Sequence, residues 1–397
     1  MYQKSMANRS NRVRSSSQSL TMSSDDDDHP KLPHDVAVEI LKRLPVGSLL
    51  RFRCVCRSWR STIDDPRFVA LHLSHSALDA SNWHLACVDL YDPVQSLCSL
   101  FSGESLARPS LSQIEIPFAA PPNCYGFVGS CNGLICVTDI SEDRCGRTMY
   151  LWNLFTRKHK AIPESDFLSM EHVHIVLGFG FDARWNDYKI VRIIYYPYEH
   201  PQGFGKIKPQ VDIYSLWTDS WRSLECEVPT FCSDRPPAFS NGNLHWFVFK
   251  HNDLQEYEYG SILLFDVASE VFDEMALPEK LLHVVSVGLD VFVSVLNDLL
   301  AVIILHENAF RHPDVHCVSY VWVMRDYGVP ESWTKLYTFN PSALVTGFDC
   351  FTWNGELLML ISGGERVSWN PITGQLANFP LSRRCELVTV VESLVSL

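Results

Sequence analysis

The 397-residue sequence has no long apolar run, although 46% of its residues are hydrophobic. No stretch approaches the roughly 20 residues that a membrane-spanning helix needs, and residues 1–30 lack the apolar centre of a secretory signal. We therefore expect no membrane insertion. Charged residues make up only 20% of the chain, so most of it should fold.

Clustered cysteines are also missing. The thirteen cysteines are odd in number and include no CxxC pair. A structural zinc site needs ligands at short regular spacings, and a disulfide framework pairs its cysteines. We expect thiols buried in a reducing compartment, a protein of the cytoplasm and nucleus, and no metal or cofactor.

The motifs of common enzyme classes are absent. Residues 178–182 read GFGFD, which does not continue as a dinucleotide-binding loop, and the chain has no GxSxG elbow. His312 and His316 are four residues apart, but Pro313 disfavours a helix that would place both on one face. We expect a non-catalytic protein.

The formal net charge is -13. Within residues 1–30, Lys4, Arg9, Arg12 and Arg14 balance the acidic run at 25–28, so the excess lies on the rest of the chain. Because phosphate binding needs a basic face, this acidic body argues against nucleic acid as a partner. The Ser- and Arg-rich leader, residues 1–30, is predicted to be disordered.

Residues 31–76 have a helical pattern. Val36, Ile40 and Leu44 recur at helical spacing, and Pro45 ends the first helix. Two further short helices should follow, with Ser48 as the N-cap of the first of these two. These roughly 45 residues hold more apolar side chains than three short helices can bury, so we expect a protein partner. A helical cap packed on the following domain is the alternative.

This segment resembles the F-box. The matching pieces, in order, are Leu32–Pro33, Asp35, Glu39–Ile40–Leu41, Leu44–Pro45, the run 48–53, Val55–Cys56, Ser58–Trp59–Arg60, Pro66 and Phe68, with Arg57 where lysine is commoner. F-box proteins bind Skp1 and, through it, cullin and RING subunits of a ubiquitin ligase. The resemblance implies a Skp1-binding set of Leu32, Pro33, Ile40, Leu41, Leu44, Pro45, Leu49, Leu50, Val55, Cys56 and Trp59.

From Trp83 onward, runs rich in Val, Ile, Phe, Tyr and Trp alternate with turn residues. Turns carrying an asparagine recur at positions 132, 186, 241, 297 and 354, with spacings of 54 to 57 residues. A second mark is an Asn or Asp followed three residues later by Thr or Ser, at Asn153, Asp266 and Asn370. It indicates a second hairpin closed by an Asx or Ser/Thr turn.

Two hairpins in each unit make four strands, the content of one propeller blade, at a period near the roughly 50 residues of kelch repeats. Five marked units and the strands at 85–117 predict a mainly β chain with a small N-terminal helical domain. The β domain, residues 83–397, is expected to be a propeller of about six blades, closed by the apolar tail 387–397. A two-sheet sandwich is the alternative.

Residues 83–397 resemble the F-box-associated domain of a large plant family. The matching pieces are 129–134, 151–153, 178–182, 187–191, 211–221, 242–246, 262–266 and 392–395. The resemblance implies the substrate-recognition subunit of an SCF (Skp1–cullin–F-box) ubiquitin ligase. The alternatives are a Skp1-bound adaptor that scaffolds or shields its partner, and a propeller lectin or enzyme with a helical cap. The family's roles include plant defence and self-incompatibility, and the sequence does not choose among them.

The segment Tyr195–Pro209 is the predicted target-binding loop. It combines three prolines, two glycines and four aromatic residues. Aromatic side chains supply large contact areas at interfaces, and proline lowers the cost of ordering a loop. We expect target contacts from Tyr196, Tyr198, His200 and Phe204. A loop packed on its own blade is the alternative, and His306–His316 is the second candidate segment.

Overall fold

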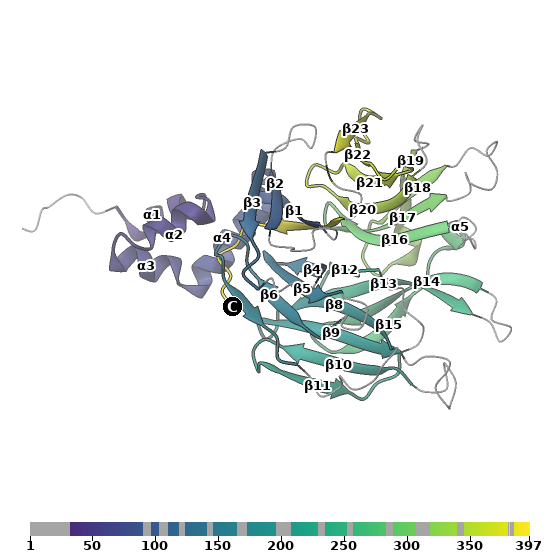
Figure 1. Ribbon diagram of the computed structural model, residues 1–397, viewed down its shortest axis with the longest axis horizontal. Helices are drawn as coiled ribbons and strands as arrows, with labels where there is room; N and C mark the ends of the chain where they lie inside the picture. Colours follow the sequence, from purple (N-terminus) through teal and green to yellow (C-terminus); the bar gives the residue numbers. More distant parts are fainter. Residues whose placement is uncertain are drawn as a thin grey trace, which may run out of the picture.

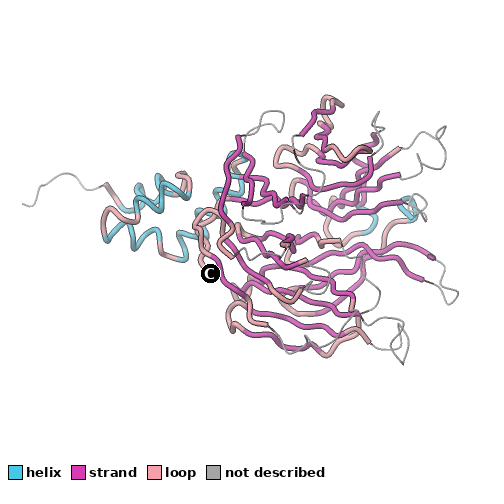
Figure 2. Tube along the Cα trace, viewed as in Figure 1, coloured by secondary structure: helices cyan, strands magenta, loops and turns pink. Residues whose placement is uncertain are grey.

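The computed structural model describes two joined parts (Figure 1). Four helices form a lobe on one side of a ring of strands, and Figure 2 shows that the ring is mainly strand. The leader 1–30 lies outside the described residues. Those residues are 32–89, 97–102, 110–118, 124–140, 146–164, 173–195, 208–228, 235–251, 257–282, 289–306, 318–339, 345–379, 381 and 385–397.

The lobe contains α1 (His34–Leu41), α2 (Val46–Phe52), α3 (Arg57–Ile63) and α4 (Pro66–Leu78), followed by the short 3-10 helix η1 (Ala80–Asn82). Both α1 and α2 begin directly after a proline, Pro33 and Pro45. The predicted cap Ser48 is wrong, because Ser48 lies inside α2 and donates its N–H to the Pro45 carbonyl. None of the described helices has the length and apolar character needed to cross a membrane.

Side chains cap the last two helices. The Cys56 sulfur accepts the N–H of Trp59 at the start of α3. Asp65 accepts the N–H of Arg67 at 2.7 Å at the start of α4, where Pro66 takes the first helical position. The lobe therefore continues to Leu78, two residues beyond the predicted end of the helical segment at residue 76.

The ring is a six-bladed β-propeller, since the described strands form six four-stranded antiparallel sheets. Blade 1 contains β24 (Cys385–Val391), β1 (Trp83–Asp89), β2 (Leu97–Ser102) and β3 (Ser110–Glu115). Blade 2 contains β4 (Tyr125–Cys131), β5 (Leu134–Asp139), β6 (Met149–Trp152) and β7 (His159–Ala161). Blade 3 contains β8 (His174–Asp182), β9 (Asp187–Tyr195), β10 (Gln210–Ser215) and β11 (Ser220–Leu224).

The other three blades repeat the same order. Blade 4 contains β12 (Ala238–Ser240), β13 (Asn243–His251), β14 (Tyr257–Asp266) and β15 (Val271–Met275). Blade 5 contains β16 (Leu289–Leu296), β17 (Leu299–His306), β18 (Ser319–Met324) and β19 (Trp333–Phe339). Blade 6 contains β20 (Val345–Phe351), β21 (Leu357–Ile361), β22 (Arg366–Trp369) and β23 (Leu376–Phe379). The helix α5 (Glu279–Leu282) follows blade 4, and the 3-10 helix η3 (Pro330–Ser332) lies before β19.

The repeated asparagines lie between the first and second strands of blades 2 to 6. In three of these turns both central residues have positive φ, as a type I′ hairpin requires: Asn132–Gly133, Asn241–Gly242 and Asn297–Asp298. The hairpins predicted from the repeat are confirmed.

The second mark joins the third and fourth strands of blades 2, 4 and 6. Asn153 Oδ1 accepts the N–H groups of Phe155 at 2.9 Å and Thr156 at 3.0 Å. Asp266 and Asn370 bind the amides two and three residues ahead in the same way. The predicted Asx turns are confirmed.

Both kinds of turn lie on one face of the propeller, because successive strands of a blade run in opposite directions. Residues 132, 156 and 186 of these turns line the same cleft as side chains of α3 and α4. We call this side of the propeller the lobe face.

β24 closes the ring. It pairs antiparallel with β1, from Trp83 opposite Val391 to Asp89 opposite Cys385. It also packs against β4 of blade 2 and β20 of blade 6, so it is the innermost strand of blade 1. The predicted closure is confirmed as far as Val391, and the remaining six residues leave the sheet. This pairing covers the edge of β1, which would otherwise be open and invite aggregation.

Candidate functional site

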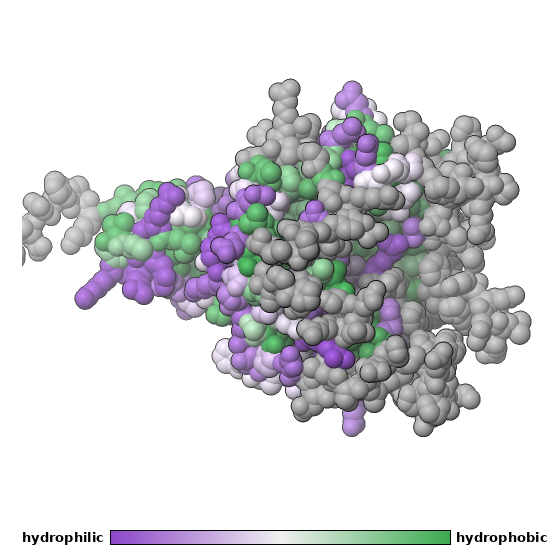
Figure 3. Space-filling model, viewed as in Figure 1, coloured by the Kyte–Doolittle hydropathy of each residue, from purple (hydrophilic) through white to green (hydrophobic). Residues whose placement is uncertain are grey.

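Apolar side chains lie on the outer part of the helical lobe, where Figure 3 shows hydrophobic surface. Leu32, Val36 and Ile40 follow one another at four-residue spacing and are 55%, 43% and 49% exposed. Helical periodicity places Val36 and Ile40 on one side of α1, and Leu32 lies just before the start of that helix. Val55, before α3, is 66% exposed. Exposed apolar residues gathered in this way mark a protein-binding surface.

The predicted Skp1-binding set falls into three groups by exposure. Leu32, Pro33, Ile40, Pro45, Val55 and Cys56 are exposed, Leu44, Leu50 and Trp59 are half-buried, and Leu41 and Leu49 are buried. The buried pair belongs to the core of the lobe with Val46, Ile63 and Phe68. These two residues therefore support the surface from beneath. Val36 was missing from the predicted set, although its spacing from Ile40 could have identified it.

Ion pairs order the charged side of the lobe. Arg53 binds Asp64 through two nitrogens, and Lys42 Nζ lies 2.7 Å from Glu39 Oε1. The Arg53 guanidinium lowers the pKa of Asp64, and hydrogen bonding from Lys42 lowers the pKa of Glu39. The lobe, residues 32–78, has seven Lys and Arg against four Asp and Glu, so it is basic.

The six residues after β24, Glu392–Leu397, cross from the propeller to the lobe, and we call them the tail segment (Figure 1). Leu394 is buried in the lobe core beside Leu41 and Phe68. Glu392 Oε2 accepts the N–H of Val46 at 2.9 Å, at the start of α2. Helix α2 has no side-chain cap of its own, so Glu392 acts as its cap from a distant part of the sequence.

Two histidines surround this carboxylate. His84 Nε2 lies 3.5 Å from Glu392 Oε1, and His72 Nε2 lies 3.0 Å from the Leu44 carbonyl. Burial opposes ionisation of Glu392, but its contacts with His84 and the Val46 amide keep its pKa below the usual value. Burial also lowers the pKa of His72. The junction therefore holds a carboxylate between Val46 of the lobe and His84 of the propeller.

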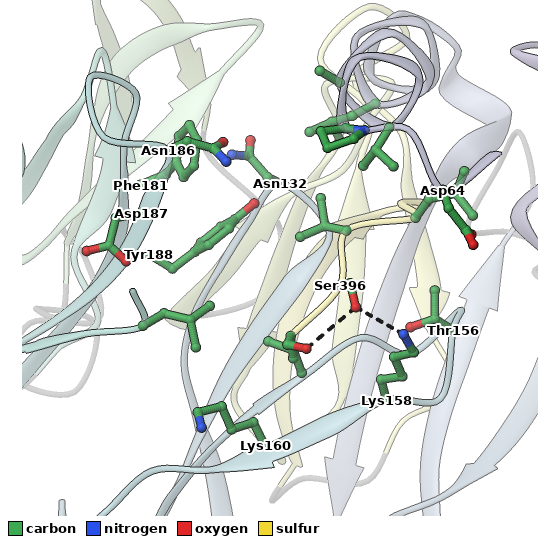
Figure 4. Close-up of a pocket in the computed structure, with 18 of the residues that line it drawn as sticks. Asp64, Asn132, Thr156, Lys158, Lys160, Phe181, Asn186, Asp187, Tyr188 and Ser396 are labelled. Atoms are coloured by element: carbon green, nitrogen blue, oxygen red, sulfur yellow. Dashed lines mark hydrogen bonds between the residues drawn. The ribbon is translucent and has the colours of Figure 1, made fainter. Parts of the chain in front are cut away.

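A cleft of about 1090 Å³ lies between the lobe and the lobe face (Figure 4). Its helical wall includes Asp64, and its propeller wall includes Lys160 and Tyr188. Lys158 Nζ donates to Ser396 Oγ at 3.0 Å, which places the tail segment along one side of the cleft. Within the described ranges, no three His, Cys, Asp or Glu side chains lie together in a way that could hold a metal ion. The cleft is lined from both sides and is a junction between the lobe and the propeller.

The propeller axis holds a second cavity of about 660 Å³. Leu73, Ser74 and Ala77 of α4 line it at the lobe face. Arg235 is also part of its lining and stacks over the Phe292 ring at 4.0 Å while its Nη2 donates to Asp290. Helix α4 thus contacts both cavities and lies close to the axis of the ring.

The predicted target contacts Tyr196, Tyr198, His200 and Phe204 lie outside the described residues, as do residues 307–317 of the second candidate segment. The strands that flank the first loop are described. β9 begins at Asp187 on the lobe face, and Tyr195 lies eight residues further along, about 26 Å away at 3.3 Å per residue. The strand therefore ends at the face opposite the lobe.

Two tryptophans lie outside the blade core. Trp185 and Trp217 are 73% and 81% exposed, whereas Trp152 and Trp246 are buried. Trp185 belongs to the turn before β9, and the Trp217 N–H donates to Asp187 at the start of β9. Both lie in turns on the lobe face of blade 3. Their position in turns places their side chains beyond the sheet, and this position in the sequence could have identified them as exposed.

The architecture agrees with comparisons to known families. The F-box domain family matches residues 30–71, and the F-box associated beta propeller domain family matches residues 107–356. The second match alone covers more than half of the chain. The protein belongs to the plant F-box proteins that carry an F-box associated β-propeller domain.

Relatives in Arabidopsis thaliana span both parts of the chain. F-box protein At3g07870 is 28% identical over 87% of this chain and 86% of its own length. F-box/kelch-repeat protein At3g23880 is 28% identical over 77% of this chain and 78% of its own length. F-box protein CPR1 is 26% identical over 92% of this chain and 88% of its own length. Family membership supports a general role in substrate recognition by SCF ligases.

Proposed function

We propose that this protein is a non-catalytic substrate receptor of an SCF E3 ubiquitin ligase. The lobe binds a Skp1-type adaptor and, through it, the cullin and RING subunits. The propeller holds a protein target for ubiquitination and proteasomal degradation. Transfer chemistry belongs to the other subunits. We place this activity in the cytoplasm and nucleus, where ubiquitin ligases of this class meet their targets.

The exposed stripe of Leu32, Val36 and Ile40 is the observation that carries this proposal. These side chains belong to an F-box, yet the lobe core leaves them in water. Covering apolar surface stabilises a complex by about 25 cal/mol per Å². The adaptor is the partner that an F-box implies. The propeller provides a separate body on which a target can be held.

Adaptor binding can be tested at the start of the stripe, on Leu32 and its exposed neighbour Pro33. Replacing Leu32 and Pro33 with Ala should weaken adaptor binding by about tenfold or more, because two exposed anchor residues lose their contact area. Both residues are exposed, so the helical circular dichroism should not change. The control is Ile372→Ala, which truncates an exposed apolar residue of the propeller. Undiminished adaptor binding by the double variant would contradict the assignment.

A Skp1-bound adaptor that shields its partner is the competing role, and turnover separates the two. Proximity labelling with and without proteasome inhibition should reveal captured proteins that accumulate only when degradation is blocked. Their half-lives should lengthen when cullin activity is inhibited. A bound protein whose half-life does not depend on cullin activity would favour the shielding role.

A further inference from the structure

Two connections join the lobe to the propeller. The first is covalent and short: η1 follows α4 directly, and the Trp83 side chain donates from Nε1 to the Ala77 carbonyl at 3.0 Å. The second is the tail segment, which returns from β24 to the lobe core. A single linker allows two domains to move about a hinge, whereas a second attachment restricts that motion.

Asn153 holds the tail segment on the propeller. Its Nδ2 donates to the Ser393 carbonyl at 3.0 Å and to the Val395 carbonyl at 2.9 Å. Asn153 and Ser393 are both fully buried. Leu394, between the two gripped carbonyls, is the residue that enters the lobe core. The amide therefore fixes the backbone on both sides of the side chain that anchors the lobe.

The equivalent turn in blade 4 shows that the two hydrogen bonds from Asn153 Nδ2 to the tail segment are not needed to form the turn. Asp266 forms the same Asx turn in blade 4 with a carboxylate, which offers only acceptors. The turn at position 153 thus needs only an acceptor, and the amide donor serves the tail segment. Gly133 leaves room for the crossing, since a Cβ there would lie 2.2 Å from the Ser393 Cβ.

We infer that the tail segment is a strut that fixes the F-box in one orientation on the propeller, with Asn153 and Leu394 as its positioning residues. Resting on the proposed function, the strut directs a bound target toward the site of ubiquitin transfer. The tail segment contacts both parts of the molecule: Glu392 caps α2, Leu394 fills the lobe core, and Ser396 accepts a hydrogen bond from Lys158. The strut therefore couples closure of the ring to placement of the lobe.

Asn153→Asp tests the strut with little change in shape. The variant keeps the acceptor that the turn needs and replaces the donor to the tail with a second acceptor. The matched control is Asp266→Asn, the reverse exchange in a turn that holds no tail. Leu394→Ala is the second variant, because it removes the anchor in the lobe core and leaves the Asn153 turn intact.

Hydrogen exchange and small-angle scattering of the full chain bound to its adaptor provide the first readout. In Asn153→Asp and Leu394→Ala, amides around Val46 and in residues 392–397 should exchange about tenfold faster, as expected when a local contact opens. The scattering curve should indicate a larger maximum dimension. Asp266→Asn should match the unaltered protein. Unchanged exchange and dimensions in both variants would overturn the inference, whatever the ubiquitination result.

The second readout is the pattern of ubiquitin transfer to the receptor's own lysines in a reconstituted ligase. A fixed lobe should confine modification to one sector of the propeller, and loss of the strut should spread it over more lysines while adaptor affinity stays the same. If Asn153→Asp and Leu394→Ala both give the same modification pattern as the unaltered protein, the orienting role is overturned. If the unaltered protein binds no adaptor, the proposed function fails, while exchange and scattering of the chain alone still decide whether the strut exists.

Discussion

The helical lobe and the propeller deal with their apolar residues in opposite ways. The propeller closes its ring with β24, so each sheet packs between two neighbours, and its exposed apolar residues are scattered over different strands and turns. The lobe exposes Leu32, Val36 and Ile40 in one stripe. The difference shows that the propeller covers its apolar strands with its own neighbouring sheets, whereas the lobe leaves an apolar surface that a partner can cover. Among the residues that the structure describes, the lobe presents these exposed apolar side chains in a row at the start of a helix and along it.

Charge separates the same two regions. The lobe has an excess of three positive charges, whereas residues 79–397 have 21 Lys and Arg against 38 Asp and Glu. Long-range electrostatic attraction is therefore opposite in sign for the two parts, and salt should weaken it. Charge alone cannot draw one partner to both surfaces, which fits a protein that holds two different partners.

The largest expected effect comes from breaking the closure of the ring. Val390 of β24 is fully buried in the core between blades 1 and 2. Val390→Asp should cost about 4 kcal/mol or more, because an unpaired carboxylate would enter an apolar site. Urea denaturation followed by tryptophan fluorescence measures this loss. The variant should also aggregate through its unpaired strand edges.

Val271→Asp is the control for the closing strand. It makes the same substitution at an exposed position on β15, the outermost strand of blade 4. It should change the free energy of unfolding by less than about 0.5 kcal/mol. A soluble Val390→Asp protein with the same urea midpoint as this control would argue that the ring does not depend on β24.

A smaller effect is expected where the two regions meet. Gly133 and Gly242 occupy equivalent turns with φ of 80° and 78°, so Ala strains the backbone similarly at both. Gly242→Ala meets nothing within 4 Å, whereas a Cβ at Gly133 would lie 2.2 Å from Ser393 Cβ and 2.7 Å from the Val391 carbonyl oxygen. Gly133→Ala should therefore cost about 1–3 kcal/mol more in denaturant unfolding. Equal losses in the two variants would show that the tail does not press on this turn.

The propeller was predictable from the sequence because its signals are local. An Asn–Gly pair specifies a tight hairpin through positive φ, and an Asn followed by Thr specifies an Asx turn through contacts two and three residues away. These signals set the period and thus the number of blades. The apolar segment 387–397 was predicted to close the ring, and β24 does so as far as Val391.

The junction was not predictable because its contacts join distant residues. Ser48 was chosen as a cap from its neighbours, but Glu392 caps α2 from 346 residues away. Nothing near Leu394 in the sequence indicates that it completes the lobe core instead of the propeller. Trp185 resembles a core residue by type, yet its turn places it on the surface. Local sequence patterns define helices, strands and turns. The packing of these elements decides whether a residue such as Leu394 or Trp185 is buried or exposed.

Titration should distinguish Glu386 in the propeller from Glu39 and Asp64 in the lobe by the sign of the pKa shift. The pKa values of Glu39 and Asp64 in the lobe are lowered by Lys42 and Arg53, so their stabilising contribution is present above the unfolded pKa and is lost as pH falls. Burial raises the pKa of Glu386 in β24, although its Oε2 accepts the Phe127 N–H at 2.6 Å. Its contribution is present below the unfolded pKa and is lost as pH rises through the folded pKa.

Glu386→Gln should therefore stabilise the propeller only at higher pH. Glutamine keeps an acceptor for the Phe127 N–H and removes the group that must ionise in a buried site. Below about pH 4 both proteins carry a neutral side chain, so their free energies of unfolding should be similar. At pH 7 the variant should be more stable, by about 1.4 kcal/mol for each unit by which folding raises the pKa. Urea denaturation from pH 4 to 8 measures this difference in the free energy of unfolding. Glu39→Gln in the lobe should have the opposite effect and make the protein less stable at the higher pH. A difference that does not vary with pH would show that Glu386 does not ionise differently in the folded and unfolded chains.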